Sequence, residues 1–159
     1  MNPVMSGGDP ENNPLLNGIT ADQNNVRASV MPPPAKPMPP LTWSTTVAAA
    51  AQAWANNCQF QHGGTGNYGQ NIYATSSTAT PLEVVSSWAS EQANYDYAAN
   101  TCSAICGHYT QMVWASSLNL GCGVQNCTQN SPFGGGNSPW QFWVCDYNPP
   151  GNFSGQQPY

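Results

Sequence analysis

Six cysteines constrain the fold of this chain more than any other feature. All six lie in the last two thirds of the sequence: Cys58, Cys102, Cys106, Cys122, Cys127 and Cys145. An even number of cysteines predicts a disulfide framework, and a metal site is the alternative. The intervals Cys102 to Cys106 and Cys122 to Cys127 differ from the close cysteine pairs of a zinc ribbon. We therefore predict disulfides, and with them an extracellular, oxidising location.

Charge is scarce, which limits the possible partners. Only 6% of the 159 residues are charged, against about 25% in an average globular domain. The two basic residues, Arg27 and Lys36, cannot form the cationic cluster that nucleic acids or anionic membranes require. No apolar run reaches the length of about 18 residues expected of a membrane span. Low charge density also leaves self-association open, because few like charges would oppose it.

The sequence divides into an arm and one domain. Residues 1–14 are rich in Asn, Pro and Gly and predict a flexible N-terminal arm, and residues 15–159 predict a single domain. Helices are predicted over residues 19–30, 44–57, 81–94 and 107–114, and strands over residues 118–124 and 141–147. Ser44 suits a helix N-cap and Pro81 a first helical turn. Helices interleaved with strands favour an α+β or layered α-β-α architecture.

Two histidines, His62 and His108, are the scarcest residues of functional interest. Together they could supply half of a tetrahedral zinc site. A single histidine is more often structural, so the segments around the two residues decide between these interpretations.

These segments resemble the CAP superfamily, which includes cysteine-rich secretory proteins, antigen 5 and pathogenesis-related type 1 proteins. Residues 106–114 (CGHYTQMVW) and 144–153 (VCDYNPPGNF) resemble its two hallmark segments. Three further segments match in order: residues 58–63 with the first histidine, 68–72 with Gln70 where the family usually has Glu, and 88–95 with a second Glu. The resemblance covers roughly residues 17–159 and implies a CAP domain within the predicted domain of residues 15–159.

The resemblance implies a three-layer α-β-α sandwich of the α+β class, with a mainly antiparallel central sheet and a groove. The groove residues carried over are His62, Gln70, Glu91 and His108. In the family, two histidines and two glutamates can hold a divalent cation such as zinc. Because an amide carries no charge, we expect the site at His62 and His108 to bind metal weakly or not at all. A hydrogen-bonded polar cluster is the alternative.

The family pattern also implies the disulfides Cys58–Cys127, Cys102–Cys106 and Cys122–Cys145. Lipid binding, with sterols and fatty acids as ligands, is the activity that the resemblance implies. Trp140, Phe142 and Trp143 are candidate ligand contacts, although their alternation also suits a core strand with both faces covered.

The resulting hypothesis is a secreted, non-catalytic CAP protein that binds a lipid, a sterol or another apolar ligand. Two alternatives stay open, namely an extracellular structural or self-assembling protein and a metal-dependent hydrolase. The hydrolase is disfavoured because the cysteines are committed to disulfides and Gln70 removes one of the two carboxylates.

Overall fold

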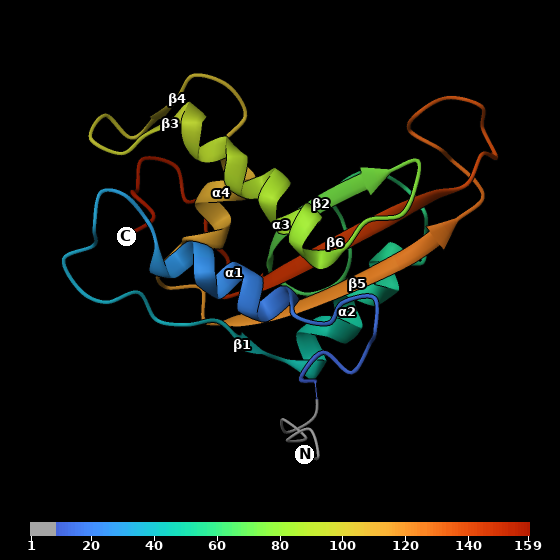
Figure 1. The fold of residues 1–159 in the computed structure, drawn as a ribbon, viewed down its shortest axis with the longest axis horizontal. Coiled ribbons are helices and arrows are strands. Elements are labelled where there is room, and N and C mark those ends of the chain that lie inside the picture. Colours follow the sequence, from blue (N-terminus) through green and yellow to red (C-terminus); the bar gives the residue numbers. More distant parts are fainter. Residues whose placement is uncertain (1–8) are drawn as a thin grey trace, which may run out of the picture.

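The fold is a four-stranded sheet between two layers of helices, as a computed structural model of residues 9–159 shows (Figure 1). The helices are α1 (Ile19–Ala28), α2 (Thr45–Ala55), α3 (Pro81–Ala89), the 3-10 helix η1 (Ser90–Asn94) and α4 (Gly107–Met112). The strands are β1 (Thr42–Trp43), β2 (Gly69–Thr75), β3 (Tyr95–Asp96), β4 (Thr101–Cys102), β5 (Asn119–Cys127) and β6 (Trp140–Asn148). No helix in residues 9–159 is long and apolar enough to cross a bilayer.

The central sheet has the strand order β1-β5-β6-β2. Both β5 and β2 pair with β6 in antiparallel register, and only the short β1 runs parallel to its neighbour β5. Strands β3 and β4 form a separate hairpin. The predicted α+β, three-layer, mainly antiparallel fold is therefore confirmed.

Strand β6 separates two hydrophobic cores. Trp140, Phe142 and Val144 pack with α2 on one face, whereas Trp143 and Tyr147 pack with α1, α3 and α4 on the other. In Figure 1, α2 accordingly lies on the opposite side of the sheet from α3 and α4. Trp140, Phe142 and Trp143 are at most 2% exposed. The strand thus has both faces covered, and the expectation that these three rings contact a ligand is wrong, because packing hides them.

Local sequence signals explain where the two longest predicted helices begin. The Ser44 hydroxyl accepts a hydrogen bond from the Val47 amide at the start of α2. Thr80 and Glu83 form a capping box ahead of Pro81. Helix α3 ends at Ala89, earlier than predicted, because the chain tightens into η1.

The described part of the predicted arm is packed against the domain. The Glu11 side chain is buried and accepts a hydrogen bond from the Thr20 amide in the first turn of α1. This contact satisfies one of the amides that a helix N-terminus leaves free. Residues 9–14 therefore belong with the domain, and residues 1–8 lie outside the described part of the chain.

Three disulfides cross-link the domain. The structure pairs Cys58 with Cys127, Cys102 with Cys106, and Cys122 with Cys145, which is the pairing that the resemblance implies. The first joins the end of α2 to β5, and the third links opposing residues of β5 and β6. The second lies directly before α4, in the segment that carries His108.

Candidate functional site

The first half of the site is formed by Glu91 and His108 and is called the carboxylate half. Glu91 lies in η1 and His108 in the first turn of α4. His108 Nδ1 donates to Glu91 Oε2 at 2.7 Å, and Glu91 Oε1 accepts from the amides of His108 at 2.9 Å and Tyr109 at 3.2 Å. The Trp88 ring lies almost parallel to the imidazole, with the ring centres 6.1 Å apart. Glu91 thus holds both the side chain and the backbone of the segment with His108.

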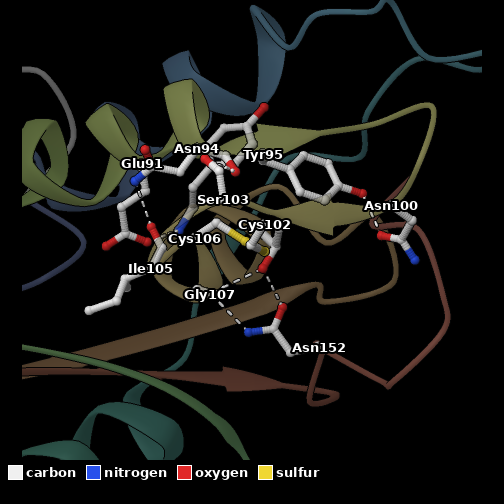
Figure 2. The surroundings of a disulfide bond; sticks show 12 residues. Glu91, Asn94, Tyr95, Asn100, Cys102, Ser103, Ile105, Cys106, Gly107 and Asn152 are labelled. Atoms are coloured by element: carbon white, nitrogen blue, oxygen red, sulfur yellow. Dashed lines mark hydrogen bonds between the residues drawn. A yellow bond between two sulfur atoms is a disulfide. The ribbon is translucent and has the colours of Figure 1, made fainter.

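The loop before α4 is fixed by amide side chains as well as by a disulfide. Figure 2 shows Asn94 of η1 donating to the Ile105 carbonyl and Asn152 donating to the Gly107 carbonyl on either side of the Cys102–Cys106 bond. Asn152 Oδ1 also accepts a hydrogen bond from the Thr110 hydroxyl. The segment with His108 is therefore anchored from η1 and from the chain that follows β6.

The second half is formed by His62, Gln70 and Asp146 and is called the amide half. Gln70 Oε1 accepts from His62 Nδ1 at 3.0 Å and from the Gly63 amide at 3.1 Å. Gln70 Nε2 donates to the Gly63 carbonyl at 2.8 Å and to Asp146 Oδ1 at 2.9 Å. The glutamine therefore ties the exposed loop with His62 to the neighbouring strand, and it uses both of its polar atoms to do so.

Asp146 belongs to the site although it was not among the residues predicted from the sequence. It opposes Gln70 in the β2–β6 register and is only 3% exposed. Burial raises its pKa to about 6, and the hydrogen bond from Gln70 opposes part of this increase. An acidic residue within an apolar strand was the available signal. Its partner could only be assigned once the register was known.

The predicted tetrad is split into two pairs. His62 contacts Gln70, and His108 contacts Glu91. Among residues 9–159 no group of three or more His, Cys, Asp or Glu side chains is placed to hold a metal ion. The Glu91 oxygens already accept three N–H donors, and Gln70 is uncharged. Glu91 and Gln70 are therefore engaged as hydrogen-bond partners of the segments that carry the two histidines.

Two hollows adjoin these pairs. The first, called the amide groove, has a volume of about 410 Å³. Its side-chain lining comes from His62, Tyr68, Gln70, Gln111 and Asn152, and glycines supply the rest. The second, called the apolar cavity, has a volume of about 270 Å³ and is lined by the rings of Tyr95, Trp114, Phe153 and Pro158 and by the Cys102–Cys106 disulfide. Polar side chains complete its lining, namely Asn100, Thr110, Asn152 and Gln156. Asn152 lines both hollows.

Comparison of the sequence with known proteins finds relatives in plants and animals. Pathogenesis-related protein 1 of Arabidopsis thaliana is 40% identical over 124 residues, which cover 76% of this chain and 71% of the relative. GLIPR1-like protein 1 of Mus musculus is 37% identical over 147 residues, which cover 86% of this chain but only 60% of that longer protein.

Solved structures agree with the fold. Venom allergen-like protein 4 of Schistosoma mansoni superposes with a TM-score of 0.65 at 28% identity, covering 89% of this chain and 86% of the other. A structure described as NaASP2 with Zn2+ superposes with a TM-score of 0.76 at 25% identity, covering 96% of this chain and 88% of the other. The model of the CAP group, described as the cysteine-rich secretory protein family, matches residues 20–147. The chain therefore belongs to the cysteine-rich secretory protein (CAP) family.

Proposed function

We propose that this chain is an extracellular, non-catalytic binding protein whose ligand is a lipid, a sterol or another apolar molecule. The location is supported by the three disulfides, which persist in oxidising compartments, and by the secretory family to which the chain belongs.

A non-catalytic role is supported by how the candidate catalytic groups are used. All six cysteines are in disulfides. Each histidine directs Nδ1 to Gln70 or Glu91, and within residues 9–159 neither ring is bonded to a serine or threonine hydroxyl. Nucleophilic catalysis needs a nucleophile within hydrogen-bond reach of its base. The polar groups of the site thus act as structural partners of one another.

A metal-dependent role is less well supported for this chain than for one protein of similar structure. The NaASP2 structure was described with Zn2+. In this chain Gln70 stands between His62 and Asp146 and satisfies both through its amide. We therefore propose that the amide half is a structural cluster with little zinc affinity.

The apolar cavity is the single observation that carries the proposed ligand class. Tyr95, Trp114 and Phe153 present aromatic surface around a volume of about 270 Å³, just below the range of roughly 300–1,000 Å³ that is usual for ligand pockets. Phe153 is 51% exposed, so a ligand entering the cavity would cover apolar surface that is now in water. A slender acyl chain or the edge of a sterol fits this chemistry.

Binding of palmitate and of cholesterol, measured by quenching of tryptophan fluorescence, tests the proposal. Phe153→Ala should weaken binding by at least about fivefold, because it removes apolar contact area from the cavity. Phe133→Ala is the matched control, since Phe133 is 54% exposed and lies outside the cavity lining. The proposal fails if neither lipid binds, or if the two variants bind equally well.

A further inference from the structure

The amide groove lacks charge, and this limits what it can bind. Of its lining residues only His62 and Tyr68 have titratable side chains. The two basic residues of the chain do not line it, and Arg27 is buried against backbone carbonyls, including those of Pro39 and Met112. Asp146 lies behind Gln70 and is only 3% exposed. The groove therefore offers no cation to an anionic ligand and no accessible carboxylate to a cationic one.

The amide side chains of the groove are held by hydrogen bonds within the protein. Gln111 Oε1 accepts from the Gly151 amide and its Nε2 donates to the Ser117 hydroxyl, while Asn152 is held by Gly107 and Thr110. Gln70 makes the hydrogen bonds described above. Fixed side chains lose little conformational entropy when a ligand binds. The groove is thus preorganised for a ligand that approaches without moving these amides.

The loop of the groove presents its backbone and an aromatic ring. Gly66 has a φ of +93°, and a Cβ there would lie 2.5 Å from Tyr68 Cε2, so the glycine backbone packs directly against the tyrosine ring. Gly63, Gly64 and Gly66 are exposed, and Tyr68 is half-buried. His62 uses Nδ1 for Gln70, which leaves Nε2 for an outside partner. The groove thus combines hydrogen-bonding groups with a fixed ring.

Neutral carbohydrate matches this combination. A pyranose ring has an apolar C–H face that stacks on an aromatic ring, and hydroxyl groups at its edge that exchange hydrogen bonds with imidazole and peptide groups. It carries no charge that the groove would have to neutralise. We propose that the amide groove is a binding site for a neutral saccharide, with Tyr68 as the stacking ring and His62 as a hydrogen-bonding partner. This site shares Asn152 with the apolar cavity but does not rest on the lipid proposal.

Calorimetric titration of the full chain with neutral oligosaccharides tests the site. The probes are chitotetraose, cellotetraose and mannotetraose, with a tetragalacturonate as the anionic counterpart. We expect at least one neutral probe to bind at millimolar concentration or below and the anionic probe not to bind. Tyr68→Ala should weaken binding by about tenfold, and Tyr68→Phe should bind nearly as well as wild type because the stacking ring is kept.

Two further variants make the result specific. His62→Ala removes an exposed side chain and should weaken binding by about threefold to tenfold while leaving the fold intact. Phe133→Ala, outside the groove, should bind like wild type. The proposal is overturned if no neutral probe binds, if the anionic probe binds as tightly, or if folded Tyr68→Ala and His62→Ala both keep wild-type affinity.

Discussion

The carboxylate half and the amide half hold their histidines through the same ring nitrogen but differ in the chemistry behind it. His108 donates Nδ1 to a carboxylate that also binds two amides of α4, and its side chain is 25% exposed. His62 donates Nδ1 to a neutral amide and is exposed on a loop. The acid of the amide half, Asp146, is buried behind Gln70. One half therefore holds its histidine through a carboxylate that is 14% exposed, whereas the other places a neutral amide between its histidine and a buried acid.

The largest effect is expected in the carboxylate half. Glu91→Ala removes the acceptor for three N–H groups, so we expect the free energy of unfolding to fall by about 3–4 kcal/mol in denaturant titrations. Glu83→Ala is the matched control, because the exposed Glu83 also accepts an amide at a helix start, that of Thr80. Its loss should cost no more than about 1 kcal/mol. Equal losses in the two variants would mean that the carboxylate half has no special role.

The second largest effect on stability is expected in the amide half, when the side-chain amide of Gln70 is replaced by a carboxylate. Gln70→Glu removes the donors to Gly63 and Asp146 and places two carboxylates 2.9 Å apart, so unfolding free energy should fall by about 2–3 kcal/mol at neutral pH. Gln52→Glu is a matched control, since Gln52 also bridges two segments, donating to Asn56 and to the Val124 carbonyl. Adding Asp146→Asn should restore most of the loss only in the Gln70→Glu protein. If both single variants lost similar amounts of unfolding free energy, repulsion between the carboxylates at positions 70 and 146 would not explain the effect.

A smaller effect depends on pH and belongs only to the amide half. The pKa of Asp146 is raised by burial from 3.8 to about 6, so the folded protein binds more protons than the unfolded chain between these values. Its contribution to the unfolding free energy is therefore fully present below about pH 4 and is lost as pH rises to about 6. Asp146→Asn should abolish this dependence. The unfolding free energy of the variant should therefore rise by about 2 kcal/mol relative to that of wild type between acid and neutral pH.

Denaturant unfolding of both proteins across this pH range measures the difference. The carboxyl carbon resonance of Asp146 gives an independent readout by NMR and should titrate near pH 6. Titration of that resonance close to the ordinary value of 3.8 would contradict the burial argument.

Much of the fold could be predicted because its signals are local. The N-cap at Ser44, the first-turn proline at Pro81 and the alternation along residues 140–145 each reflect nearest-neighbour physics, and the structure shows all three. In α3 the buried stripe runs through Val84, Val85 and Trp88, whereas Leu82 in the first turn is 61% exposed. The helix predicted over residues 81–94 thus begins where α3 begins.

Features that depend on pairing could not be predicted. Strand β2 begins Gly-Gln-Asn, residues with low strand propensity, and exists because it pairs with β6 along its whole length. The contact between Gln70 and Asp146 follows from that register. The resemblance supplied the four groove residues, but only the geometry shows that they form two separate pairs.

Zinc titration tests the central claim, that the amide at position 70 makes this half a structural cluster instead of a metal site. Gln70→Glu would set a second carboxylate between His62 and Asp146, completing three potential ligands. By calorimetry at neutral pH, we expect weak or undetectable Zn2+ binding to wild type and at least about tenfold tighter binding to Gln70→Glu. The gain should be lost in the double variant with His62→Ala. Equal zinc affinity of wild type and Gln70→Glu would show that the amide at position 70 does not prevent metal binding.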